Sequence, residues 1–441
     1  MGKREEKILE VLKAYKEYQP PNGEEQFLRE VFNKTSEELV TVCKQVPYYK
    51  LFLIQKALFS VLKDWKVKTR TKINRSGTRA PIEYVAFDIG YGTKEEAIKE
   101  GSIVLVSADD QRLVVRFETD YFDDMEEARP EVFLTCAREK EGWLEEVCRR
   151  IDDWMLKNNY FRGKKIKPDG KFLDIKKGGY TWDDIILDQT VKGEIIRNIT
   201  DYFVLREIYQ KNNLPSKRGI ICYGPPGTGK TLLGKVLASQ IGATFIWVSS
   251  SDVASAKSIS IIFQMARELS PTILFFEDVD LFASIRDYND NTKVLGELLV
   301  QMNGFIENND LFIIATTNDI KVIEPALKNR PSRFDSLIEF KPFDEQLRAR
   351  MMAQLLKDHK IIKGESYDLL ARRVAKLTEG ITGAEMKEFF IAALKLAVEK
   401  RCMDEQDRVI LSYELFKDVR ERIGIGQKRL AGFGGHNTSL D

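Results

Sequence analysis

The sequence contains little histidine and no closely spaced cysteine pairs, and both shortages limit its chemistry. Only His359 and His436 occur in 441 residues, which excludes zinc motifs of the H-E-x-x-H type and catalytic triads built on histidine. The five cysteines are scattered without a C-x-x-C pair, a pattern that argues against zinc and favours a reducing compartment. Any catalysis is therefore expected to use other groups.

The sequence also lacks an excess of charge of either sign and any long apolar run. Lys and Arg number 69 against 68 for Asp and Glu, so no global basic field indicates nucleic acid. The start of the chain has no signal-peptide core, and the apolar stretch 51–62 is too short for a membrane span and contains Gln55 and Lys56. We therefore expect a soluble, cytoplasmic protein without a membrane span.

A glycine-rich segment at 224–231 is the strongest signal in the chain. It reads Gly-Pro-Pro-Gly-Thr-Gly-Lys-Thr, follows the apolar run 218–223 and precedes apolar residues at helical spacing in 232–238. A strand that ends in such a loop and opens a helix binds phosphate through backbone N–H groups and the helix N-terminus. Lys230 would reach the β- and γ-phosphates, and the Thr231 hydroxyl would ligate Mg²⁺. The predicted nucleotide contacts are Gly224, Pro225, Pro226, Gly227, Thr228, Gly229, Lys230, Thr231 and Leu232.

Polar groups follow two later strands. Strands and helices alternate from Tyr180 onward, which favours a parallel sheet. The expected strands are 219–223, 244–248, 272–276, 311–316 and 337–340. Glu277 and Asp278 follow the third, at the edge where open α/β sheets bind ligands, and there they can hold Mg²⁺ through water and orient an attacking water. Asn318 would lie beside them.

Changes in periodicity predict five regions. Residues 1–80 are expected to be a helical segment, in which core or subunit packing is favoured over a membrane-surface role for the amphipathic stretch 48–65. Short β-branched runs predict a small β-rich domain over 81–177, closed by a helix at 142–157. The basic stretch 163–171 is interpreted as a solvated loop, with nucleic-acid contact as the minor alternative. Three regions complete the chain: a large α/β domain at 178–343, a helical lid at 344–423 and a disordered tail at 424–441.

Together these motifs resemble the AAA clade of the AAA+ ATPases over roughly residues 178–422. Residues 224–231 resemble Walker A, 273–280 Walker B, 315–318 sensor 1, and 324–335 the second region of homology. The resemblance implies ATP and Mg²⁺ as cofactors, and an α/β P-loop core with a parallel sheet plus a small helical lid. It implies catalytic roles for Lys230, Asp278, Asn318, Arg330 and Arg333, and a metal site at Thr231 and Glu277, the latter through water. It also implies adenine contacts from Ile185, Gly383 and Ala384.

A finer resemblance concerns the entry to the ATPase domain. Residues 182–188, 199–203 and 214–219 resemble those of the mitochondrial respiratory-complex assembly AAA proteins and their bacterial relatives. Those enzymes also tend to carry Glu-Asp where most of the clade has Asp-Glu. Here Glu277 takes the metal-coordinating place and Asp278 the place of the catalytic base, so the base is one methylene shorter and the metal ligand one longer.

The resemblance implies a hexameric ring that uses ATP to act on protein clients through residues 1–175. A nucleic-acid-handling motor or loader is the alternative, and an ATP-gated scaffold that barely hydrolyses is a third interpretation. Threading members of the clade carry an aromatic–aliphatic–Gly loop soon after the second strand, whereas residues 249–258 here are small and polar. Ser and Ala bury little apolar area, so we expect no threading by an aromatic pore loop.

Overall fold

The computed structural model describes residues 22–74, 77–90, 92–121, 128–212, 219–284, 293–303, 310–321, 336–359 and 366–423. The chain divides into two compact units, Met1–Phe172 and Leu173–Asp441, and each is described by itself. The predictions for residues 1–21 and for the tail 424–441 lie outside the described residues.

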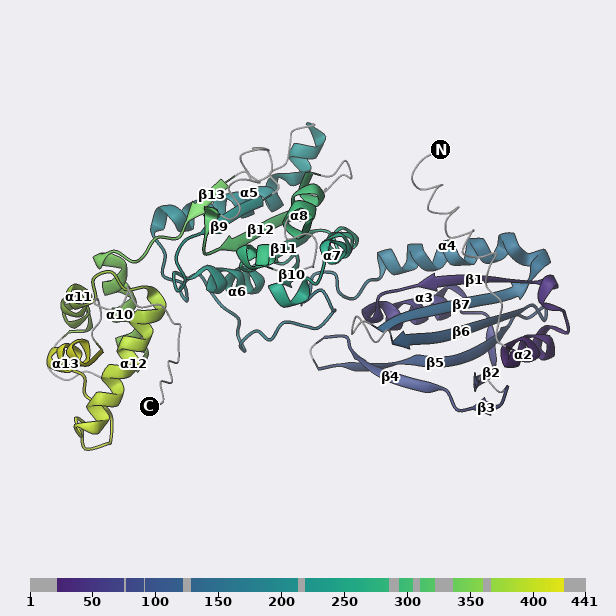
Figure 1. Cartoon of the computed structure of the whole chain (residues 1–441), viewed down its shortest axis with the longest axis horizontal. Helices are drawn as coiled ribbons and strands as arrows, with labels where there is room; N and C mark the ends of the chain where they lie inside the picture. The colour runs from purple at the N-terminus through teal and green to yellow at the C-terminus, as the bar shows by residue number, and fades with distance from the viewer. Residues whose placement is uncertain are drawn as a thin grey trace, which may run out of the picture. The chain divides into compact units, whose positions relative to one another are not determined.

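The first unit is built on a seven-stranded sheet whose paired strands run antiparallel (Figure 1). The strand order is β1-β7-β6-β5-β2-β3, and β4 pairs with β5. The strands are β1 (Leu39–Gln45), β2 (Lys66–Ile73), β3 (Arg79–Ala80), β4 (Glu83–Asp88), β5 (Lys94–Val106), β6 (Arg112–Tyr121) and β7 (Ala128–Ala137). The unit also contains α2 (Asn22–Phe32), α3 (Leu51–Val61), α4 (Glu141–Lys157) and the short strand β8 (Lys165–Ile166).

Alternating side chains of this sheet enter two separate cores. Val40 and Val42 of β1 belong to the larger core, which also contains the buried residues of α3 and α4. Leu39 belongs to a smaller core with Phe27 of α2. Because successive strand residues point to opposite faces, α2 lies on the face opposite to α3 and α4. The amphipathic stretch around α3 is therefore core, and its buried Gln55 side chain exchanges two hydrogen bonds with the backbone of Ile98, at 2.7 and 2.8 Å.

The expectation of a helical segment over 1–80 is wrong for its described part. The helices α2 and α3 are present, but β1 and β2 lie between and after them and pair with β7 and β5. β2 shows no apolar alternation because its neighbour β3 has only two residues, which leaves most of β2 as an exposed edge. Residues 22–80 and the strands after residue 81 therefore form one sheet.

The second unit contains the parallel sheet that the sequence predicts. The order is β13-β9-β12-β11-β10, and each pair is parallel. The strands are β9 (Gly219–Tyr223), β10 (Thr244–Val248), β11 (Thr272–Phe276), β12 (Leu311–Thr317) and β13 (Ser336–Glu339). β11 and β12 are buried at every residue, as expected for central parallel strands covered on both faces. The helices of this sheet are α5 (Gln189–Lys211), α6 (Lys230–Gln240), α7 (Ala256–Glu268) and α8 (Lys293–Asn303).

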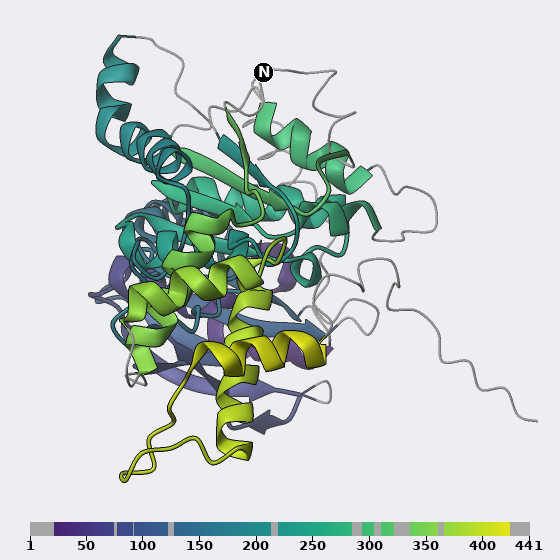
Figure 2. The same ribbon diagram turned by 90° about the vertical axis from the view of Figure 1, so that its left-hand side faces the viewer.

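Four further helices follow the sheet and have a core of their own. They are α10 (Glu345–His359), α11 (Tyr367–Leu377), α12 (Gly383–Glu399) and α13 (Tyr413–Ile423), and Figure 2 shows them in light green to yellow. All four lie within the range 344–423 that the sequence predicts to be helical. Among the described residues, no helix has the length and apolar character required to cross a membrane.

Candidate nucleotide site

The loop between β9 and α6 has the backbone of a phosphate cradle. Gly224 and Gly227 have φ of 149° and 79°, in the region that favours glycine. A Cβ on Gly224 would lie 2.1 Å from the carbonyl oxygen of Phe340, so no other residue fits there. Gly229, with φ of 106°, precedes the first residue of α6. The loop thus ends at a helix N-terminus, where unpaired N–H groups attract anions.

Lys230 lies beneath this loop. Its Nζ donates to the carbonyl oxygens of Gly224, at 2.7 Å, and Pro225, at 2.9 Å, and the residue is only 5% exposed. Burial lowers the pKa of Lys230, and the carboxylates of Asp278 and Asp280 act against that shift. Thr228 closes the turn by donating from Oγ1 to the Pro225 oxygen at 2.9 Å. A cation in this position is complementary to the phosphates of a nucleotide.

Thr231 and Glu277 meet at the start of α6. The Thr231 hydroxyl donates to Glu277 Oε1 at 2.6 Å, and Trp247 Nε1 donates to Glu277 Oε2 at 2.9 Å. A hydroxyl and a carboxylate are the hard oxygen donors that Mg²⁺ prefers. The side chains therefore fit the expected metal, and Thr231 and Glu277 are the residues that would hold it.

Asp278 forms hydrogen bonds with Thr316 at the end of the neighbouring strand β12 and with Asn318, which follows that strand. Asn318 Nδ2 donates to Asp278 Oδ1 at 3.2 Å, and the Asp278 amide donates to Thr316 Oγ1 at 3.0 Å. Asp278 has a φ of 49°, an uncommon backbone conformation for this residue type that often occurs at functional sites. Burial raises the pKa of Asp278, and the nearby carboxylates of Asp280 and Glu277 raise it further. The Asp280 carboxylate accepts a hydrogen bond from the backbone N–H of Asn318 at 3.1 Å.

The start of α12 contacts the loop directly. The Ala384 amide donates to the Gly227 oxygen at 3.1 Å, and a Cβ on Gly227 would lie 2.8 Å from Thr382 Oγ1. Gly383 packs against the Phe343 ring. Thr382 also caps α12, since its side chain and that of Glu385 form a capping box. The segment expected at adenine therefore serves as both a helix cap and a neighbour of the loop.

Of the remaining predicted residues, three are described by the structure and two are not. Ile185 is buried, with its side chain 3.7 Å from the position of a Cβ on Gly229. Leu232 is partly buried and packs against the hydrophobic core of this unit. Pro226 is an exposed residue of the loop. Arg330 and Arg333 lie outside the described residues, so their roles stay predictions.

Three residues of this site were missed by the sequence reasoning. Thr316 and Asp280 lie within the stretches 315–318 and 273–280, and Trp247 lies within the expected strand 244–248, but the sequence gives none of them a role of its own. No local pattern marks a tryptophan in one strand as the partner of a glutamate that follows the next. That contact appears only when β10 and β11 are paired.

Comparison with known proteins identifies the domain. Residues 220–342 match the family described as "ATPase family associated with various cellular activities (AAA)". The proteasome-activating nucleotidase of Methanocaldococcus jannaschii is 36% identical over 193 residues, which cover 41% of this chain and 44% of that protein. The ATP-dependent zinc metalloprotease FtsH 2 of Thermoanaerobacter sp. is 31% identical over 264 residues, with 58% and 49% covered. Protein SAV of Sulfolobus acidocaldarius is 34% identical over 216 residues, with 47% and 27% covered. The chain spans less than half the length of each of these relatives.

Proposed function

Because residues 220–342 form an AAA ATPase domain, an ATP-hydrolysing enzyme domain, we propose that the protein is a Mg²⁺-dependent ATPase that remodels protein clients. The observation that carries the proposal is the convergence of Lys230, Thr231, Glu277, Asp278 and Asn318 at one edge of the parallel sheet. Each has a described partner that fixes its side chain. The edge combines a phosphate cradle, a metal site and a carboxylate base.

The residues divide the work of hydrolysis. Lys230 neutralises phosphate charge. Thr231 and Glu277 would hold Mg²⁺, which would stabilise negative charge on the phosphates when bound. Asp278 accepts the proton of the attacking water. Asn318 orients the Asp278 carboxylate through the 3.2 Å hydrogen bond. The short base is thus held in place by its backbone conformation and by an amide from β12.

Two variants test the assignment. Lys230→Ala should abolish nucleotide binding, and Asp278→Asn should bind ATP but hydrolyse it at least about 10²-fold more slowly. Asp319→Asn is the matched control, because among the described residues Asp319 Oδ1 accepts from the backbone amide of Lys321 in its own turn, and an asparagine can accept the same bond. Normal turnover by Asp278→Asn would show that another group is the base.

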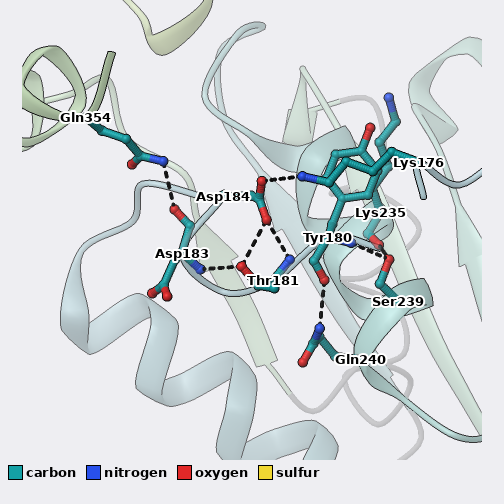
Figure 3. Close-up of polar contacts among 9 residues, drawn as sticks. All are labelled: Lys176, Tyr180, Thr181, Asp183, Asp184, Lys235, Ser239, Gln240 and Gln354. Atoms are coloured by element: carbon teal, nitrogen blue, oxygen red, sulfur yellow. Dashed lines mark hydrogen bonds and ion pairs between the residues drawn. The ribbon is translucent and has the colours of Figure 1, made fainter. Parts of the chain in front are cut away.

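The chain that enters the second unit is fastened to the helix of the phosphate loop (Figure 3). The Tyr180 amide donates to Ser239 Oγ at 2.9 Å, and Gln240 Nε2 donates to the Tyr180 oxygen at 2.8 Å. The ammonium groups of Lys176 and Lys235 lie 4.4 and 5.8 Å from the centroid of the Tyr180 ring. Ser239, Gln240 and Lys235 belong to α6, which begins at Lys230. The segment that follows the first unit in the chain is therefore fixed to the helix that begins at the phosphate loop.

The proposal includes a ring, most simply a hexamer, in which Arg330 and Arg333 reach the γ-phosphate of a neighbouring subunit. Contacts between unlike surfaces of identical subunits form a ring when the rotation between neighbours closes. Mixing Arg333→Ala subunits with Lys230→Ala subunits should restore some complete sites and part of the activity. A monomer with full ATPase activity, measured by light scattering and phosphate release, would contradict the ring.

The proposed client is a folded or partly folded protein, in the cytoplasm and without nucleic acid. Two relatives have names that refer to proteolysis, which supports a protein client. The segment after β10 is small and polar, with the 3₁₀ turn Ser250–Asp252, and offers no aromatic grip. We expect slower client aggregation rather than unfolding of a tailed fluorescent fusion; rapid ATP-dependent loss of fluorescence, abolished by Lys230→Ala, would contradict it.

A further inference from the structure

The carboxylate of Glu277 is held at both oxygens. Thr231 Oγ1 donates to Oε1 at 2.6 Å, and the indole Nε1 of Trp247 donates to Oε2 at 2.9 Å. The Thr231 contact lies on the side of the predicted metal. The Trp247 contact comes from β10, on the other side of β11 from the phosphate loop.

Packing fixes the position of the indole. Trp247 is the parallel partner of Phe275 on β11, and the two rings lie 4.6 Å apart between centroids. The absence of a side chain at Gly234 of α6 makes room for both rings. A Cβ at Gly234 would lie 2.6 Å from Phe275 Cζ and 2.8 Å from Trp247 Cζ3. The Glu277 amide donates to the Val248 oxygen at 2.8 Å, which fixes the backbone between the two side chains. Contacts with β10, β11 and α6 therefore direct the indole N–H toward the Glu277 carboxylate.

We propose that Trp247 is a positioning residue for the metal-binding carboxylate of Glu277, an inference that rests on the proposed Mg²⁺-dependent ATPase function. A glutamate has one more rotatable bond than an aspartate, so its carboxylate loses more conformational freedom when it is fixed. The indole supplies one N–H donor and no acceptor, so it can hold Oε2 without competing for a cation. Oε1 is thereby kept facing the Thr231 hydroxyl.

If Trp247 served only to fill space in the core, a replacement of similar size without the N–H would leave metal affinity unchanged. A phenylalanine or a sulfur analogue of tryptophan fills much of the same space but lacks the N–H. Support of a ligating side chain by such a partner is typically worth about 10- to 100-fold in metal affinity or activity. The N–H therefore separates the two roles, and the readout is metal affinity.

The experiment measures Mn²⁺ binding by EPR to the full-length protein saturated with a non-hydrolysable ATP analogue. We expect Trp247→Phe, and a protein with 3-benzothienylalanine at position 247, to bind Mn²⁺ at least about 10-fold more weakly, with unchanged binding of the analogue in EDTA. Phe275→Leu is the matched control: it loosens the packing around the indole but keeps the N–H, so its Mn²⁺ affinity should fall less than that of the benzothienylalanine protein. In a Glu277→Asp background the shorter carboxylate cannot reach both donors, so Trp247→Phe should add little further loss.

The outcomes are distinct. Wild-type Mn²⁺ affinity in the benzothienylalanine protein would overturn the positioning role, as would an equal loss in Phe275→Leu. If the wild type binds Mn²⁺ with the analogue but hydrolyses no ATP, the proposed function fails while the ratio of affinities still tests Trp247. The NMR signal of the Trp247 indole N–H gives an independent check, since it should shift in Glu277→Gln and stay in place in Asp319→Asn.

Discussion

Replacing Gly234 by alanine places a methyl group where two aromatic rings already pack. Gly234 lies inside α6, and the new Cβ would be 2.6 Å from Phe275 Cζ, 2.7 Å from Phe275 Cε1 and 2.8 Å from Trp247 Cζ3. Phe275 is fully buried and belongs to the core of the sheet. The rings therefore have little room to yield, and Trp247 is also the donor to Glu277.

Two effects of this substitution have opposite signs. Alanine inside a helix gains about 1 kcal/mol over glycine. Overpacking a core typically costs about 1–3 kcal/mol, and three contacts below 3 Å belong at the upper end of that range. We expect a net loss of about 1–2 kcal/mol in the free energy of unfolding. At about 2–4 °C for each kcal/mol, the Tm should fall by roughly 2–8 °C.

The assay is thermal unfolding, with Mn²⁺ affinity as a second readout. Gly296→Ala in α8 is the matched control, because a Cβ there meets no atom within 4 Å, and this variant should gain up to about 1 kcal/mol. In Gly234→Ala the displaced indole should also weaken Mn²⁺ binding, which a loss of stability alone would not do. If Gly234→Ala is as stable as Gly296→Ala, the reasoning from the two rings is refuted.

Substitutions at three further positions have outcomes that follow from one or a few hydrogen bonds. Arg348 is 5% exposed and donates to the carbonyl oxygens of Phe343 at 2.7 Å and Ala375 at 3.1 Å, so Arg348→Leu should destabilise the lid helices by about 2–3 kcal/mol in urea unfolding. Thr382→Ala removes the cap of α12 and should cost about 1 kcal/mol, whereas Thr382→Ser should keep most of it. Hydrogen bonds from Arg408 lower the pKa of Asp404 to about 2, so its stabilising effect is present above about pH 4 and disappears as the pH falls through about 2. Asp404→Asn should therefore speed local hydrogen exchange at pH 7 but not at pH 2.

The sequence predicted the second unit well because its signals are local. The strands are short buried runs, and the phosphate loop is defined by glycines whose positive φ no other residue adopts easily. The lid helices carry apolar residues at helical spacing and a Thr382–Glu385 capping box. Each of these signals lies within about twenty residues and can be identified before any tertiary contact is known.

The first unit and the supporting contacts of the site could not be predicted in the same way. β1 pairs with β7 in a register that joins Leu39 to Ala137, almost a hundred residues apart. β2 carries polar residues on both faces because only the two-residue β3 lies beyond it. The hydrogen bond from Trp247 to Glu277 depends on strand pairing, on a tilted contact between two rings and on the absence of a side chain at Gly234. No window of sequence contains all three.

The order of the two acids agrees with the residues that support them. Glu277, the longer side chain, reaches between Thr231 and the indole of Trp247. Asp278, the shorter one, stands on a left-handed backbone and receives Asn318 from the opposite neighbouring strand. An aspartate at 277 would leave the partly buried indole N–H without its acceptor. A glutamate at 278 would have to displace the Asn318 side-chain amide that now contacts the proposed base. An unpaired buried donor costs about 1–3 kcal/mol, so the reversed order would be the less stable one in this particular site. The Glu-Asp order is therefore consistent with an active site whose neighbouring strands are built to hold it.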